Sequence, residues 1–111
     1  MAWFRREPAP DRAPALIDIC VDIADRLREV DPALWQRMHR LLADAGVHAV
    51  LPDGEPFDPE RFDAIGRADT SDERLQLTVA STEFAGYVDG DRVVRRPQVV
   101  VYRTEAVHAD D

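Results

Sequence analysis

The run RVVRRPQVVVY at residues 92–102 is the strongest strand signal in the chain. Valine and tyrosine are residue types that pack well on a pleated sheet. Pro97 interrupts the run. Because proline cannot donate a hydrogen bond to a neighbouring strand, it predicts an edge position or a bulge at that point. The Asp89-Gly90 pair just before the run is a favoured turn, so we expect a β-hairpin that carries arginines.

The β pattern extends back to the middle of the chain. Residues 47–51 and 84–88 are short strand candidates, and the sequence Pro52-Asp53-Gly54 predicts a turn. Apolar and polar residues alternate over 75–80, which predicts a half-buried strand.

One short helix interrupts this β-rich part. Asp58-Pro59 is a helix-start pair, since aspartate caps free N–H groups and proline fits the first helical position. We therefore expect one or two helical turns from Pro59 to about Ile65, and a polar loop over residues 69–74.

The first half of the chain has a helical pattern instead. Over residues 15–30, apolar side chains recur at spacings of four, three, four and three, which places them on one face of a helix. The residues of this face are Leu16, Cys20, Ile23, Leu27 and Val30.

Asp31-Pro32 predicts the start of a second helix that runs to about Ala45, where Gly46 is suited to close it. Its apolar face comprises Leu34, Met38 and Leu41. Because almost no chain separates the two helices, we expect an antiparallel helical hairpin.

These elements predict an α+β fold: a short, bundle-forming two-helix hairpin followed by a small β-rich domain. We expect a flexible leader at 1–14, the hairpin at 15–46, the β-domain at 47–103 and an acidic tail at 104–111.

The composition excludes several classes of function. The 111 residues carry a formal net charge of −8, and all 14 basic residues are arginines, which disfavours nucleic-acid binding. No apolar run approaches the roughly 20 residues of a membrane helix, and no secretory signal is present. The single cysteine, Cys20, cannot form an internal disulfide, which fits the cytoplasm.

No pattern indicates catalysis, a metal or a cofactor. The carboxylates are scattered, and the chain has neither a glycine-rich phosphate loop nor a Gly-x-Ser-x-Gly motif. The histidines lack metal-ligand spacing, so we expect surface or structural roles for His39, His48 and His108. We therefore expect a protein that is not an enzyme and binds no metal.

Arg92, Arg95 and Arg96 form a local reversal of charge in an acidic chain. Charged residues on an exposed strand can protect its edge from aggregation. Arginine is also favoured where a protein binds an acidic partner. Composition alone leaves both explanations open.

Three motifs in order resemble the GrpE-type nucleotide exchange factors, which serve Hsp70/DnaK chaperones. They are Phe57-Asp58-Pro59 with the residues after it, Gly86-Tyr87, and the run from Arg92 to Val101. The spacing between these blocks also matches. Arg96 stands where the family usually has proline, and Pro97 where it has alanine.

The resemblance implies a co-chaperone in protein folding that binds an Hsp70-type ATPase domain and promotes ADP release. By position, Arg92 and Val101 fall where the family's β-domain touches the chaperone, and Glu83 falls at another contact position that is usually not acidic. Arg95 and Arg96 complete the expected partner-binding set, with Arg95 as a structural or rim residue.

The resemblance also implies a homodimer, because two short helices from each family member form a four-helix bundle. The expected interface residues are Leu16, Cys20, Ile23, Leu27, Leu34, Met38 and Leu41. Only about fifteen residues precede the first helix, so the chain resembles a reduced form without the long N-terminal stalk helix.

Two further hypotheses remain. An acidic adaptor could use the same fold to bind a partner without exchange activity. A small enzyme using the loop carboxylates is disfavoured, because no pair offers an acid and a base in a plausible pocket.

Overall fold

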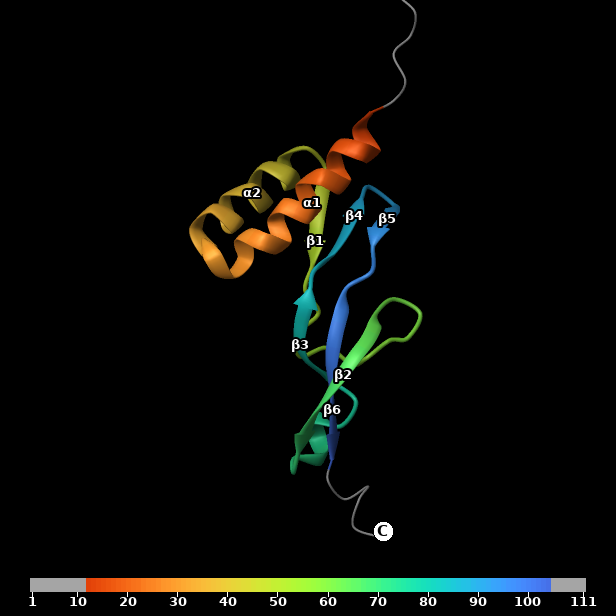
Figure 1. Ribbon diagram of the computed structural model, residues 1–111. Coiled ribbons are helices and arrows are strands. Elements are labelled where there is room, and N and C mark those ends of the chain that lie inside the picture. Colours follow the sequence, from red (N-terminus) through yellow and green to blue (C-terminus); the bar gives the residue numbers. More distant parts are fainter. Residues whose placement is uncertain (1–11, 105–111) are drawn as a thin grey trace, which may run out of the picture.

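The computed structural model describes residues 12–104 (Figure 1). Two helices come first and a β-rich part follows, so the expected α+β fold is confirmed. The elements in chain order are α1 (Ala13–Val30), α2 (Pro32–Asp44), β1 (Val47–Val50), β2 (Asp63–Thr70), the 3₁₀ turn η2 (Glu73–Leu75), β3 (Val79–Phe84), β4 (Gly86–Asp89), β5 (Arg92–Arg95) and β6 (Gln98–Thr104).

The two helices form an antiparallel hairpin at one end of the molecule (Figure 1). The Oδ1 atom of Asp31 accepts a hydrogen bond from the N–H of Leu34 at 3.1 Å, which caps α2 as the sequence indicates. Gly46 follows α2 with a φ of 93°, a left-handed conformation that glycine adopts without strain.

The ends of the chain differ slightly from expectation. Helix α1 begins at Ala13, two residues inside the expected leader, and β6 continues to Thr104, the first residue of the expected tail. The rest of the leader and tail lies outside the described residues. No helix in the described part is long and apolar enough to cross a membrane.

The strands form two three-stranded sheets. The first sheet has the order β1-β4-β5 and is antiparallel. In the second sheet, of order β2-β6-β3, β6 lies parallel to β2 and antiparallel to β3. The chain passes between the sheets at Ala85 and again at Arg96-Pro97, and we call these residues the sheet crossing. The run over residues 92–102 is therefore two strands, and Pro97 marks a change of sheet instead of the expected edge position or bulge.

The prediction of a helix over residues 59–65 is wrong. A single turn covers residues 59–61, closed by a hydrogen bond from the Phe62 N–H to the carbonyl of Asp58 at 2.8 Å. The N–H of Asp63 then donates to the carbonyl of Pro97 at 2.9 Å, which starts the pairing of β2 with β6. This pairing overrides the local helix signal and extends β2 to Thr70, into the expected polar loop.

The strand expected over 75–80 is also wrong in its first half. Residues Glu73–Leu75 form a 3₁₀ turn, and Leu77 has a φ of 63°, so the extended strand begins only at Val79. The Leu77 N–H donates to the carbonyl of Tyr102 at 2.9 Å, so this loop is held by β6. The candidate strand at 84–88 is divided at Ala85 between β3 and β4.

The protein has two small apolar cores. The first core joins the helical hairpin to the first sheet, and the second core lies on the second sheet. The first core comprises Val21, Leu42, Val47, Ala85 and Tyr87. The second core comprises Phe62, Val79, Val99 and Val101.

Gly86 permits the close approach of chain segments at the sheet crossing. A Cβ atom at this position would lie 2.6 Å from the backbone nitrogen of Pro97 and closer still to its Cδ, which a folded protein does not tolerate. We expect Gly86→Ala to lower the free energy of unfolding by about 1–3 kcal/mol or more, as measured by urea denaturation.

Gly66→Ala provides the matched control, because a Cβ atom there would meet Cγ2 of Val100 at an ordinary 3.6 Å. We expect its effect to stay within roughly 0.5 kcal/mol. Equal effects of the two substitutions would contradict the proposed steric restriction at Gly86.

Candidate protein-binding surface

Arg92 lies beside the turn of the β4–β5 hairpin, where it pairs with Asp89 across the two strands. Gly90 supplies the turn with a φ of 61°. Nη2 of Arg92 lies 3.4 Å from Oδ2 of Asp89, and the arginine side chain is 46% exposed. Such an exposed ion pair contributes little to stability, so the Arg92 guanidinium can interact with a partner.

Arg95 is held inside the chain instead. Its Nη1 and Nη2 atoms donate to the two carboxylate oxygens of Asp25 on α1, at 2.7 and 2.8 Å. Nη2 and Nε also donate to the carbonyl of Ala85, at 2.7 and 3.1 Å. The hydrogen bonds that Arg95 donates to Asp25 raise the pKa of Arg95. We call this arrangement of Asp25, Arg95 and Ala85 the clasp.

Arg96 connects the second passage of the sheet crossing to the turn before β2. Its Nη2 atom donates to the carbonyls of Pro59 and Phe62, the latter at 2.9 Å. Its Nε atom lies 3.1 Å from Oδ1 of Asp63. The side chain remains 38% exposed, so it also contributes positive charge to the surface.

Glu83 and Val101 lie away from the β4–β5 hairpin, on the second sheet. The carboxylate of Glu83 accepts a hydrogen bond from the hydroxyl of Ser81 at 3.0 Å and is exposed. Val101 is only 4% exposed and packs in the second core, so it offers a partner very little surface. The structure therefore does not gather the five expected partner-binding residues into one patch.

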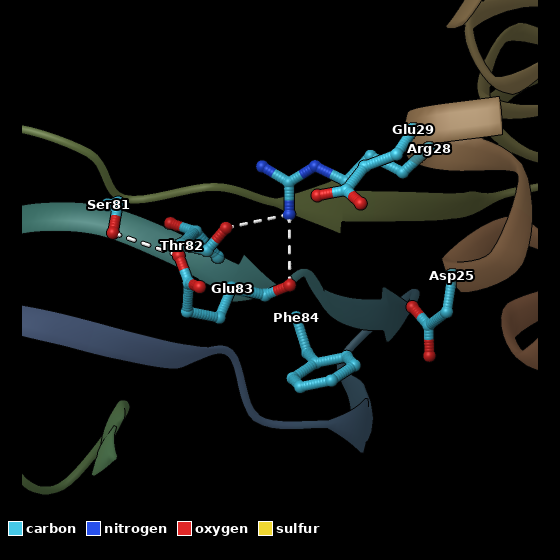
Figure 2. Close-up of a pocket in the computed structure, with 7 residues that line it drawn as sticks. All are labelled: Asp25, Arg28, Glu29, Ser81, Thr82, Glu83 and Phe84. Atoms are coloured by element: carbon cyan, nitrogen blue, oxygen red, sulfur yellow. Dashed lines mark hydrogen bonds between the residues drawn. The ribbon is translucent and has the colours of Figure 1, made fainter. Parts of the chain in front are cut away.

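A polar cleft of about 380 Å³ separates α1 from β3 (Figure 2). Arg28 reaches across it, and its Nη1 atom donates to the carbonyls of Thr82 and Glu83 at 2.7 and 3.2 Å. Arg28 thus links the helical hairpin directly to a strand of the second sheet. The sequence offers no local signal for this role, because the acceptors are backbone atoms more than 50 positions away.

Tyr87 of β4 anchors the helical hairpin through His39 of α2 and through the first core. The Nδ1–H of His39 donates to the carbonyl of Trp35 at 2.8 Å. The other ring nitrogen, Nε2, therefore accepts a hydrogen bond from the hydroxyl group of Tyr87 at 2.8 Å. Burial raises the pKa of Tyr87 to about 12. His39 therefore has a structural role, while His108 lies outside the described residues.

The outer face of the hairpin is apolar. Leu16, Ile23, Leu34 and Leu41 are 58, 42, 45 and 57% exposed. Three further residues of the expected interface are half-buried, namely Cys20, Leu27 and Met38, and the first and last of these pack against the first core. Each helix therefore directs some apolar side chains inward and others to the surface.

Within residues 12–104, no three His, Cys, Asp or Glu side chains are grouped closely enough to hold a metal ion. The described surface includes exposed arginines, a polar cleft and exposed apolar residues on the helices. All of these features are suited to binding proteins.

A model of the GrpE family matches residues 22–103, which includes the second half of α1 and all later elements nearly to the end of β6. The chain belongs to the GrpE family. Protein GrpE of Bifidobacterium longum strain NCC 2705 is 35% identical over 104 residues, which cover 88% of this chain and 47% of that protein. Protein GrpE of Synechococcus sp. strain JA-3-3Ab is 38% identical over 81 residues, which cover 69% and 33%.

This GrpE-family chain spans about half the length of the Bifidobacterium relative. The match includes Asp25 and Arg95, so both halves of the clasp fall within the family region. The contacts of the clasp are therefore the natural place to test how the hairpin and the β-rich part are held together.

We expect Asp25→Asn and Arg95→Gln each to destabilise this GrpE-family chain by about 1.5–3 kcal/mol, because each change leaves a partly buried charge without its partner. A double-mutant cycle measured by urea denaturation should show that the two effects are coupled.

The Asp22–Arg26 pair on α1 is the control, since it is 3.6 Å long and its side chains are 68 and 78% exposed. Its coupling should stay below about 0.5 kcal/mol. Similar coupling in both pairs would contradict a special role for the clasp.

Proposed function

We propose that this GrpE-family chain binds the ATPase domain of an Hsp70-type chaperone and promotes the release of ADP. The observation that carries the proposal is the family match over residues 22–103, which includes the second half of α1, all of α2 and nearly all of the two sheets. The chain spans about half the length of the Bifidobacterium relative. Exchange activity by this shorter chain is therefore proposed here and does not follow from the family match alone.

The proposed activity requires no covalent chemistry and therefore no catalytic residue. The exchange factor must bind the open, nucleotide-poor ATPase domain more tightly than the closed one. By linkage, nucleotide must then weaken the binding of the factor to the same extent. Moving a two-state equilibrium from 1:99 to 99:1 needs about 5.5 kcal/mol of differential affinity.

A rigid factor suits this task, because a flexible one would adapt to both states of the chaperone. The clasp ties α1 to the sheet crossing, and Arg28 ties α1 to β3. These contacts support the proposal that the hairpin and both sheets act on the chaperone as one body.

We assign the main chaperone contact to Arg92, whose guanidinium lies at the end of the β4–β5 hairpin and is held only by an exposed pair with Asp89. An acidic chaperone surface would supply its partner. Arg95 and Arg96 are proposed as further positions of this interface, where they also hold the fold. Glu83 and Val101 are proposed as separate contacts on the second sheet.

The first test measures release of fluorescently labelled ADP from the Hsp70 ATPase domain of the same organism by stopped flow. We expect saturating protein to accelerate release, and we expect Arg92→Glu to weaken the effect about tenfold or more through like-charge repulsion. Arg74→Glu is the control, because Arg74 is 90% exposed and lies in η2, outside the β4–β5 hairpin.

Unchanged release in the presence of the protein would overturn the exchange function. If the ATPase domain nevertheless bound, the acidic adaptor without exchange activity would be the better description. Equal effects of the Arg92 and Arg74 substitutions would overturn the assignment of the contact to Arg92.

We also propose that the chain is a cytoplasmic homodimer in which residues 15–46 pair and residues 47–103 bind the chaperone. The apolar outer face of the hairpin supports this division, because a second hairpin could bury it in a four-helix bundle. The proposed interface is formed by Leu16, Cys20, Ile23, Leu27, Leu34, Met38 and Leu41.

Sedimentation equilibrium tests the dimer. We expect Ile23→Asp and Leu41→Asp to convert a dimer into a folded monomer, because both side chains are exposed within a single chain. Ile65→Asp is the control, since Ile65 is 50% exposed on β2 and outside the hairpin. A monomeric wild-type protein, or dissociation by the control substitution alone, would contradict the proposed interface.

A further inference from the structure

Within residues 12–104, the helices cover one face of the first sheet and leave the other face open. Val47 and Tyr87 belong to the first core and lie on the helical face. Side chains alternate along a strand, so the residues next to them lie on the opposite face. The strand register places three valines on this opposite face. Val88 pairs with Val93 on β5 and with His48 on β1, so these residues share a face. Val50 lies two positions after His48 and therefore lies on the same face.

These three valines form one wall of an open groove of about 450 Å³. Phe62 and Pro97 belong to its apolar lining, and Val93 is 60% exposed. Glu60, Arg61, Arg95 and Arg96 complete the lining. An exposed apolar groove with a polar rim is typical of a site that binds another molecule.

Three arginines and one glutamate, Glu60, line the groove, so its lining carries an excess of positive charge in a chain whose net charge is −8. Arg61 is 61% exposed and lies 3.7 and 3.8 Å from carboxylate oxygens of Glu55 and Asp58. Such long, exposed ion pairs are weak, so the carboxylate of a partner can replace them at little cost. The charge of the rim therefore favours an acidic occupant.

The groove also borders an open sheet edge. In the order β1-β4-β5, β5 is the last strand, and within residues 12–104 no further strand pairs with its outer side. An extended segment can hydrogen-bond to such an edge while its side chains enter an adjacent pocket. The edge thus favours an extended occupant over a helical one.

We propose that this groove binds an extended segment of the partner chaperone in which an aliphatic side chain is flanked by carboxylates. The aliphatic group packs against Val88 and Val93, and the carboxylates lie near Arg61 and Arg96. The proposal rests on the proposed function for the identity of the partner. It adds a contact distinct from Arg92, which does not line the groove.

Binding is tested by titrating protein carrying ¹³C-labelled valine methyl groups with the Hsp70 ATPase domain. The methyl signals of Val50, Val88 and Val93 should shift more than that of Val47, which lies on the helical face. Val93→Ser should weaken binding about tenfold, as expected for the loss of one buried aliphatic group.

Two further variants keep the test independent of folding defects. Val93→Thr retains the branched shape of the side chain and should still weaken binding several-fold, and Arg61→Glu should weaken it through repulsion of the carboxylates. Ile65→Ser removes an equally exposed aliphatic side chain outside the groove and should leave binding unchanged.

The outcomes separate the two proposals. If Arg92→Glu weakens binding while the groove variants do not, the groove proposal is overturned and the proposed function stands. If the ATPase domain does not bind at all, both are overturned. Selective weakening by the groove variants, together with the valine shifts, supports the groove.

Discussion

The clasp formed by Asp25, Arg95 and Ala85 is the contact on which the arrangement of the whole molecule depends. Arg95 lies at the end of β5, just before the chain leaves the first sheet, and Ala85 lies where the chain enters it. By binding both Ala85 and the carboxylate of Asp25, Arg95 fixes the helical hairpin relative to the sheet crossing. Without the clasp, the position of the hairpin relative to the sheet crossing would depend on the few apolar contacts of the two small cores.

The distance along the chain between interacting residues explains which elements could be predicted from the sequence. Local signals identified the hairpin of helices, the cap at Asp31 and the interruption at Pro97, because each depends on neighbouring residues. Local signals predict residues 59–65 and 75–78 wrongly, since their conformation depends on pairing with β6, more than 20 positions later in the chain. Long-range pairing overrides local propensity in both segments.

The candidate site follows this rule as well. The cluster of Arg92, Arg95 and Arg96 was visible in the sequence, but the different partners of the three residues were not. Arg95 pairs with a residue 70 positions away, and Arg96 binds the turn before β2. Two of the three arginines therefore stabilise the fold, in addition to any contact with a partner. A sequence pattern can identify the residue types of a surface, while only the tertiary contacts decide which of them remain available.

The distribution of roles among the arginines is what a mechanism without covalent chemistry requires. An exchange factor acts through the difference between its affinities for two states of the chaperone, and that difference is preserved only if the factor itself keeps one shape. Arg95 and Arg28 maintain the shape by binding backbone carbonyls and Asp25. The ion pairs of Arg92 and Arg61 are exposed and can be exchanged for carboxylates of a partner. Rigidity and recognition thus use the same type of side chain, and the partly buried or exposed setting of each arginine decides which of the two it provides.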